Sequence, residues 1–186
     1  MSVITLKSDG SIAITDAELI FKNFSGNERR YNPAGRRNFC VFLNDEVADA
    51  LRNDGWNVKV LQPKTDEYEP RPYISVAVRY DVAEHLKPRI SLGTTAGMKT
   101  KLTEDTVSIL DWASIESSKM IIRPHKWTKD NGDSGKKAYL QSLSVVIEAE
   151  DYDYAYYDVP DSALNSIGGC GRCTMCDGHC KHDDEY

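Results

Sequence analysis

The segment MIIRPHKWTKDNGDSGKKAYLQSLSVVIE (residues 120–148) contains two strand-like runs separated by a turn sequence. MIIRPHKW (120–127) and KAYLQSLSVVIE (137–148) are rich in β-branched and aromatic residues, as strands are. TKDNGDSG (128–135), which lies between them, contains Asn-Gly and Ser-Gly pairs, both typical of hairpin loops. The segment therefore predicts a β-hairpin and favours a fold built mainly from strands.

Further strands are predicted on the N-terminal side of this hairpin. YISVAVRY (73–80) alternates cleanly, so Ile74, Val76, Val78 and Tyr80 should share one face and Tyr73, Ser75, Ala77 and Arg79 the other. NFCVFL (38–43) is apolar on both faces, which predicts a strand that is covered on both sides. The remaining strand-like stretches are 11–24, 57–62 and 89–94.

Helical patterns are few. Asn44 is suited to capping a short helix that Gly55 ends, with Val47, Ala50 and Leu51 on one face. Thr103 is predicted to cap a second short helix in which Val107 and Leu110 point inward. Seven or so strands with one or two short helices predict a closed or partly closed barrel or a sandwich, because crossovers of a parallel sheet would need more helices.

The charge is divided unevenly along the chain. Residues 1–147 carry 21 Lys and Arg against 19 Asp and Glu, and residues 148–186 carry 2 against 10, so +2 and −8 make the net −6. A mildly basic body with an acidic end is typical of proteins that bind a polyanion. We therefore expect a domain at 1–150 and an acidic, Tyr- and Cys-rich tail at 151–186. DYDYAYYDVPD (151–161) in this tail is compatible with a nucleic-acid mimic and equally with a solvated linker.

Basic and aromatic residues gather in three places, which favours binding of single-stranded nucleic acid. Cationic groups neutralise phosphates, and aromatic rings stack on exposed bases at about 1–3 kcal/mol per base. The alternative is that Tyr73 and Tyr139 pack laterally on an exposed sheet and that the Arg cluster is an ordinary solvated loop. The candidate binding residues are Arg29, Arg30, Tyr31, Arg36, Arg37, Tyr73, Arg79, Arg123, Lys126, Trp127, Lys136, Lys137 and Tyr139.

The tail contains four closely spaced cysteines, Cys170, Cys173, Cys176 and Cys180. Thiolates at this spacing are suited to a tetrahedral zinc site. An iron–sulfur cluster is a second alternative, although Lys181 stands where the ferredoxin pattern has Pro. A third alternative is free thiols without a cofactor in a flexible tail.

Enzyme signatures are absent from the sequence. It has no phosphate-binding Gly loop, no nucleophile elbow and no HExxH motif. Asp111 and Asp81 are interpreted as helix-end or turn carboxylates, and His125 as strand surface. No apolar run approaches the ~18 residues that a membrane span needs, and the N-terminus lacks a signal-peptide pattern. We therefore expect a cytoplasmic, non-enzymatic protein that does not enter membranes.

The sequence resembles the OB-fold single-stranded DNA-binding proteins of phages and mobile elements. The resemblance rests on FKNFSG (21–26), YNPAGRRNFCVFL (31–43), GWNVK (55–59), IIRPHKW (121–127) and KKAYLQSL (136–143), and covers roughly residues 12–150. It implies an all-β, OB-like barrel with one or two short helical insertions, a groove lined by basic and stacking residues, and an acidic tail that occupies the groove or contacts replication partners. The tail departs from the bacterial pattern by ending in Tyr186 without an apolar cluster.

Together these observations predict a protein that coats or protects single-stranded DNA during replication or recombination, in the host cytoplasm if it is phage-encoded. The acidic tail is expected to modulate binding or to recruit replication or recombination proteins. The alternative is a protein-interaction or inhibitor module of a mobile element that acts through its acidic tail. Homo-oligomerisation is left open.

Overall fold

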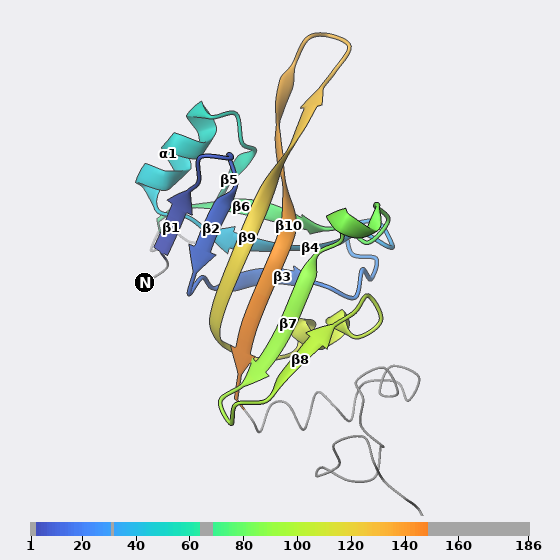
Figure 1. Cartoon of the computed structure of the whole chain (residues 1–186). Helices are drawn as coiled ribbons and strands as arrows, with labels where there is room; N and C mark the ends of the chain where they lie inside the picture. The colour runs from blue at the N-terminus through green and yellow to red at the C-terminus, as the bar shows by residue number, and fades with distance from the viewer. Residues whose placement is uncertain (1–2, 31, 64–68, 149–186) are drawn as a thin grey trace, which may run out of the picture.

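A computed structural model describes residues 3–30, 32–63 and 69–148. Ten strands form one sheet, and a path through it runs β1-β2-β9-β10-β6-β4-β3, with β5 paired to β6 and with β7 joining β10 to β8 (Figure 1). The all-β, OB-like fold class is confirmed. The strands are β1 (Val3–Leu6), β2 (Ile12–Thr15), β3 (Leu19–Asn23), β4 (Arg37–Phe42), β5 (Val58–Leu61), β6 (Arg71–Val78), β7 (Arg89–Thr94), β8 (Lys99–Leu102), β9 (Ile115–Thr128) and β10 (Ser134–Ile147).

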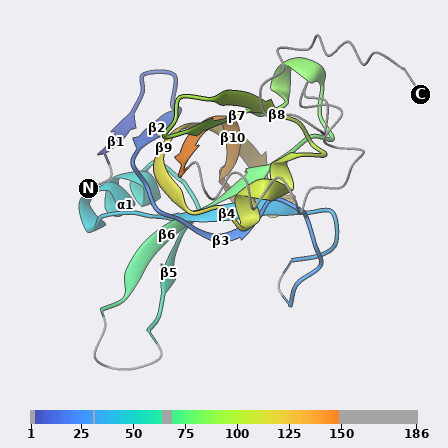
Figure 2. The ribbon, with the colours of Figure 1, turned by 90° about the horizontal axis from the view of Figure 1, so that it is seen from below.

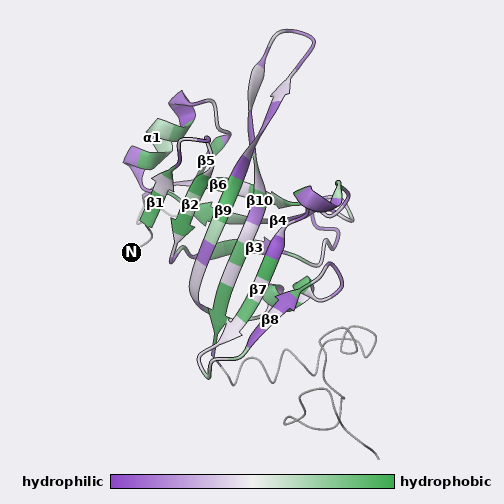
Figure 3. Ribbon diagram, viewed as in Figure 1, coloured by the Kyte–Doolittle hydropathy of each residue, from purple (hydrophilic) through white to green (hydrophobic). Residues whose placement is uncertain are grey.

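The predicted hairpin is the longest element of the fold. β9 and β10 pair antiparallel from Ser134↔Thr128 to Ile147↔Ile115, with bulges that shift the register near Leu140 and Ile147. Its upper part projects beyond the rest of the sheet as a two-stranded arm (Figure 1). The end of this arm is hydrophilic, whereas apolar residues alternate with polar ones in the lower halves of both strands (Figure 3). The hairpin is therefore both part of the core and an exposed arm.

β10 holds the two parts of the sheet together. Its middle pairs in parallel with β6 at Ala138↔Val76 and Tyr139↔Ala77, and its lower half pairs in parallel with β7 from Ser142↔Arg89 to Ile147↔Thr94. Inward side chains from both parts, including Phe39, Val76, Leu92 and Ile122, are buried in one core. Viewed from below, β5 and the beginning of β6 extend away from this body (Figure 2).

The sheet is not closed into a barrel. In the described part of the chain, β3 does not pair with β7 or β8. The 3₁₀ helix η2 (Val107–Asp111) lies against β3 instead. The Asp111 carboxylate accepts hydrogen bonds from the backbone N–H groups of Phe24 and Ser25 at 2.6 and 2.9 Å, and Lys22 Nζ donates to the carbonyl of Ala113 at 2.8 Å. Side-chain contacts thus connect elements that strand pairing leaves separate.

The helix α1 (Asp45–Asn53) forms as predicted, since Asn44 Oδ1 accepts from the Val47 N–H at 2.8 Å and Gly55 has φ 85°. Its buried residues are Ala48 and Leu51, whereas Ala50 is exposed, so the predicted inward face was wrong at that position. The second predicted helix is η2, which starts later than expected and has no side-chain cap. A short 3₁₀ turn, η1 (Glu84–Leu86), precedes β7.

The predicted strands differ from the observed ones in extent and in number. The stretch 11–24 is two strands, because Asp16 has φ 53° and breaks the extended backbone between them. β1 and β8 were not predicted. Both are four-residue strands with mostly exposed side chains, and short exposed strands leave little hydrophobic pattern in a sequence.

Candidate nucleic-acid interface

The outward face of β6 carries the residues that alternate with its buried ones. Pro72, Ile74, Val76 and Val78 are buried, so the odd-numbered side chains from Arg71 to Arg79 point away from the core. Directly paired residues of neighbouring strands share a face. The pairs Phe42↔Tyr73, Lys59↔Tyr73, Ala77↔Tyr139 and Tyr139↔Arg123 therefore extend this face over β4, β5, β10 and β9.

We call this surface the aromatic face. It consists of eight ring-bearing or arginine residues that lie on neighbouring strands at the outside of the sheet. They are Phe21, Phe42, Arg71, Tyr73, Arg79, Arg123, His125 and Tyr139.

One cluster of the aromatic face is centred on Tyr139. The His125 ring stacks on the Tyr139 ring with centroids 4.6 Å apart and an interplanar angle of 5°. The guanidinium groups of Arg79 and Arg123 lie 5.7 and 5.6 Å from the Tyr139 centroid, and Arg79 donates to the Tyr139 hydroxyl at 3.3 Å. Two flat rings and two cations thus meet at one place, from β9, β10 and the residue that follows β6.

Neighbouring groups hold both arginines of this cluster in position. Asp81 accepts two hydrogen bonds from the Arg79 guanidinium, which lower the pKa of the Asp81 carboxyl and raise that of Arg79. Arg123 donates to the carbonyl of Leu86 in η1 at 3.1 Å. The Arg79 side chain is still 41% exposed, so its charge faces solvent.

A second cluster lies nearer the start of β6. The Arg71 guanidinium sits 3.6 Å from the centroid of the Phe42 ring, and Phe21 meets Tyr73 edge to face at 6.4 Å. Phe21 has φ 51° where the β3–β4 register shifts, and its side chain is 57% exposed. An exposed phenylalanine beside a half-buried tyrosine and an arginine is suited to contact with a planar apolar ligand.

The predicted Arg loop begins next to this face. Gly26 and Gly35 are joined by a backbone hydrogen bond of 2.8 Å, and Asn38 Nδ2 donates to Asn32 Oδ1 at 3.3 Å. Asn38 pairs with Ala77, two residues before Arg79. Arg29, Arg30 and Arg36 are exposed in this loop.

Three predicted residues lie off the aromatic face. Arg37 pairs with Val78 on the core side of the sheet and forms an ion pair with Glu104 at 2.9 Å. Lys126 and Lys136 are opposite each other on the other side of the hairpin from Tyr139, and Lys136 forms an ion pair with Asp54 at 2.7 Å. Tyr73, Arg79, Arg123, Trp127, Lys137 and Tyr139 share the outward side of their strands.

Tyr31 and the four tail cysteines lie outside the described residues. Within the described ranges, no group of three or more His, Cys, Asp or Glu side chains is arranged to hold a metal ion. The zinc prediction for the tail therefore stays a prediction.

Four residues of the aromatic face were not among the predicted site residues. Phe42 was assigned to a covered face, and Phe21 lies at a bulge that no pattern indicates. Arg71 and His125 could have been found by extending the alternation, since Arg71 has the parity of Tyr73 and His125 that of Arg123. His125 was interpreted as strand surface, and that position is correct. Its stacking on Tyr139 was not predicted.

A family model described as "Putative phage ssDNA-binding domain" matches residues 1–170. The chain belongs to this family. Its members are single-stranded DNA-binding domains, so this protein binds single-stranded DNA and is not an enzyme. No curated protein matches the sequence significantly.

The solved structures that match this chain include phage proteins. One is the single-stranded DNA-binding protein of bacteriophage Enc34 in a C-terminally truncated form, which is 12% identical to this chain, with a TM-score of 0.47. The match covers 77% of this chain and 90% of the Enc34 chain. Its untruncated form is also 12% identical, with a TM-score of 0.46 and coverages of 76% and 83%. The gp2.5 protein of bacteriophage T7 is 9% identical, with a TM-score of 0.33 and coverages of 87% and 97%.

No helix among the described residues of this phage ssDNA-binding family member is long and apolar enough to cross a membrane.

Proposed function

We propose that single-stranded DNA binds across the aromatic face, with bases on the rings and phosphates on the arginines. The cluster around Tyr139 is the main support. Rings that are stacked and held by two guanidinium groups stay in place without a ligand, so little side-chain entropy is lost on binding. Such a platform is tolerant of sequence because every base has a flat apolar face.

The two clusters are spaced for more than one nucleotide. Ala77, the partner of Tyr139, lies four positions after Tyr73 along β6. Four residues of strand span about 13 Å, or roughly four stacked bases at 3.4 Å each. Ser75 and Ala77, between the clusters, are small and leave the strand open to a ligand. The aromatic face thus fits a short run of bases with arginines at both ends.

A binding assay on Tyr139→Leu tests this proposal. Loss of the central ring should weaken binding of an oligothymidylate by about 1–3 kcal/mol. Trp112→Leu is the matched control, because Trp112 is 81% exposed at the end of η2 and lies off the aromatic face. Equal affinities of the two variants, with unchanged melting temperatures, would contradict the proposal.

The wider role that we propose is to coat or protect single-stranded DNA during replication or recombination, in the cytoplasm of the host. The acidic residues 148–186 support a modulating or recruiting role for the tail, since their −8 charge opposes that of the arginines. Replication or recombination proteins are the partners that we propose for it.

We also propose that Cys170, Cys173, Cys176 and Cys180 bind one zinc ion, because four thiolates complete a tetrahedral structural site. Elemental analysis of protein purified without chelator should find one zinc per chain. Replacing all four with Ser should abolish zinc and leave melting of the body unchanged. Iron in place of zinc, or no metal, would reject the assignment.

A further inference from the structure

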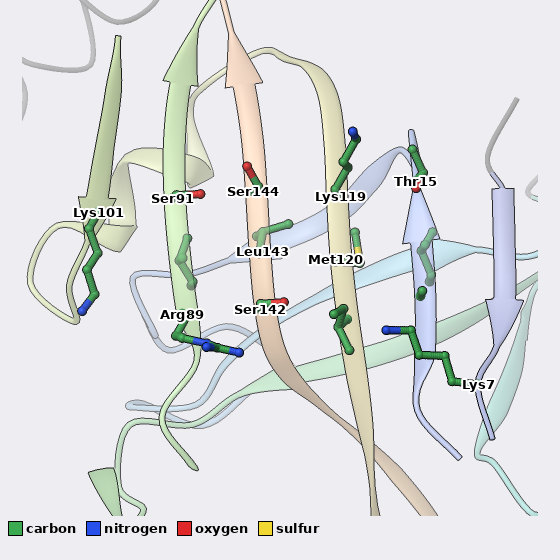
Figure 4. Close-up of a pocket in the computed structure, with 14 residues that line it drawn as sticks. Lys7, Thr15, Arg89, Ser91, Lys101, Lys119, Met120, Ser142, Leu143 and Ser144 are labelled. Carbon is green, nitrogen blue, oxygen red and sulfur yellow. The ribbon is translucent and has the colours of Figure 1, made fainter. Parts of the chain in front are cut away.

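A second surface of the sheet carries four cations around a cavity of about 610 Å³. We call it the cationic cavity and define it by Lys7, Arg89, Lys101 and Lys119, together with the hydroxyl residues Ser142 and Ser144. Figure 4 shows Lys7 and Arg89 pointing toward one another from opposite sides of the β9 and β10 strands. No carboxylate and no aromatic ring lines the cavity.

The four cations form no ion pairs with other described residues, and only Lys7 near Asp9 and Lys101 near Glu84 have a longer-range electrostatic interaction with a carboxylate. Lys7, Arg89, Lys101 and Lys119 are exposed, and none forms an ion pair in the described ranges. By contrast, Arg37, Arg79 and Lys136 each have a carboxylate partner. Like charges gathered around one hollow repel one another, and an external polyanion removes that repulsion.

The cationic cavity and the aromatic face are on the same side of the hairpin. Lys119, Ile121 and Arg123 alternate along β9 with the buried residues Ser118, Met120 and Ile122, so they point outward, and His125 lies two residues further on the same side. The bulge after Leu140 keeps the two surfaces on one side, because Ser142 pairs with Ile121 while Tyr139 pairs with Arg123. Lys119 lies four residues from Arg123, about 13 Å along the strand.

We propose that the cationic cavity is a second binding subsite for single-stranded DNA, which holds the backbone of a strand leaving the aromatic face. This inference rests on the proposed function. Without aromatic rings the subsite contacts phosphates and does not stack bases, and the Ser hydroxyls add hydrogen-bond donors for phosphate oxygens. A short oligonucleotide is held by stacking on the aromatic face, whereas a longer one reaches both surfaces.

The double variant Arg89→Gln/Lys119→Gln tests the subsite with two oligothymidylates. About 6 and about 25 nucleotides are suitable lengths, because one OB fold covers roughly 4–16. The variant should bind the short strand as the wild type does. For the long strand, the negative slope of log K against log[salt] should become shallower by about 1.4. The affinity of the variant at 0.1 M salt should be roughly 10- to 25-fold lower than that of the wild type.

The control variant is Arg52→Gln/Lys87→Gln, which removes the same charge from two ion-paired positions outside the cavity, one exposed and one half-buried. It should change binding of both lengths equally and only slightly. A cavity variant that behaves like this control, or that weakens both lengths alike, overturns the subsite. The proposal that the aromatic face binds DNA is tested separately: it fails if the Tyr139→Leu variant binds the short strand as tightly as the wild type does.

Lysine acetylation of the unmutated protein provides a measurement independent of these variants. The long strand should protect Lys101 and Lys119 at least several-fold, and the short strand should not. Lys99 lies on the same strand as Lys101 but outside the cavity, and it is the internal control. If Lys101 and Lys119 are acetylated equally fast in the presence of the long strand and of the short strand, the subsite is also overturned.

Discussion

Tyr80 illustrates how burial decides the chemistry of a single residue near the site. Its hydroxyl is buried without a hydrogen-bond partner, and burial raises its pKa from 10 to about 12. The unfolded chain releases this proton near pH 10, whereas the folded protein keeps it until about pH 12. The stabilisation is therefore complete below pH 10 and is lost between pH 10 and 12.

We expect Tyr80→Phe to remove this pH dependence. Between pH 10 and 12 the wild type should lose at most about 1.4 kcal/mol of unfolding free energy per pH unit relative to the variant, and less where solvent screens the partly exposed ring. Denaturant unfolding of both proteins at pH 8, 10 and 11.5 measures the difference. Parallel stability curves would show that Tyr80 titrates normally.

At the scale of single residues, sequence and structure agree where alternation is strict. Tyr73 and Arg79 were placed on the outward face of their strand because Ile74, Val76 and Val78 alternate with them, and the structure confirms that placement. Arg37 could not be assigned in the same way. It belongs to a segment with two pairs of arginines, 29–30 and 36–37, and only the Arg37↔Val78 register shows that it points toward Glu104.

At the scale of elements, the end of the β9–β10 arm is fixed by the packing of Trp127 on Gly135. A Cβ atom on Gly135 would lie 2.8 Å from the Trp127 ring, which is closer than van der Waals contact allows. The indole N–H is buried without a hydrogen-bond partner. Gly135 therefore leaves the space that the Trp127 ring occupies, in addition to its place near the turn.

Gly135→Ala should push the Trp127 indole outward and cost about 1–3 kcal/mol of local packing. In a Trp112→Phe background, which removes the exposed tryptophan, we expect a red shift of the fluorescence emission. Ser134→Ala, at the neighbouring exposed position, is the control and should leave the emission unchanged. An unchanged emission spectrum for Gly135→Ala would show that the Trp127 ring does not pack on Gly135.

The elements themselves were predictable in proportion to their hydrophobic pattern. The hairpin and β6 have long apolar alternations and were found nearly complete, although β9 begins at Ile115, five residues before the predicted start. KTKL in β8 has a single buried residue, Leu102, and was missed. The parallel pairing of β10 with both β6 and β7 could not be predicted, because it joins strands far apart in sequence.

At the scale of the whole molecule, charge is divided between a sheet with two cationic surfaces and an acidic end. Residues 148–186 carry −8 and begin directly after β10. A tethered segment competes at an effective concentration in the ~mM range. Its charge opposes that of the surfaces that we assign to DNA.

Ending the chain at Ile147 should tighten binding of single-stranded DNA. The gain should be largest at low salt, because the Debye length falls from about 30 Å at 0.01 M to about 10 Å at 0.1 M. Fluorescence anisotropy over a salt series measures it, with a full-length chain whose ten tail carboxylates are replaced by amides as a second test. Unchanged or weaker binding by both proteins would rule out competition by the tail.

The place of β10 at the end of the chain also affects how much of the sheet a chain in synthesis can form. Without β10, the strands from β3 to β6 pair only with one another, and β7 pairs only with β8. Strands joined over long loops form slowly. Tyr139, Arg123 and Lys119 all come from the last hairpin, so during synthesis neither the Tyr139 cluster nor the cationic cavity is complete until residues 115–147 have been made. We therefore expect a chain that is still without this hairpin to bind single-stranded DNA more weakly than the finished protein.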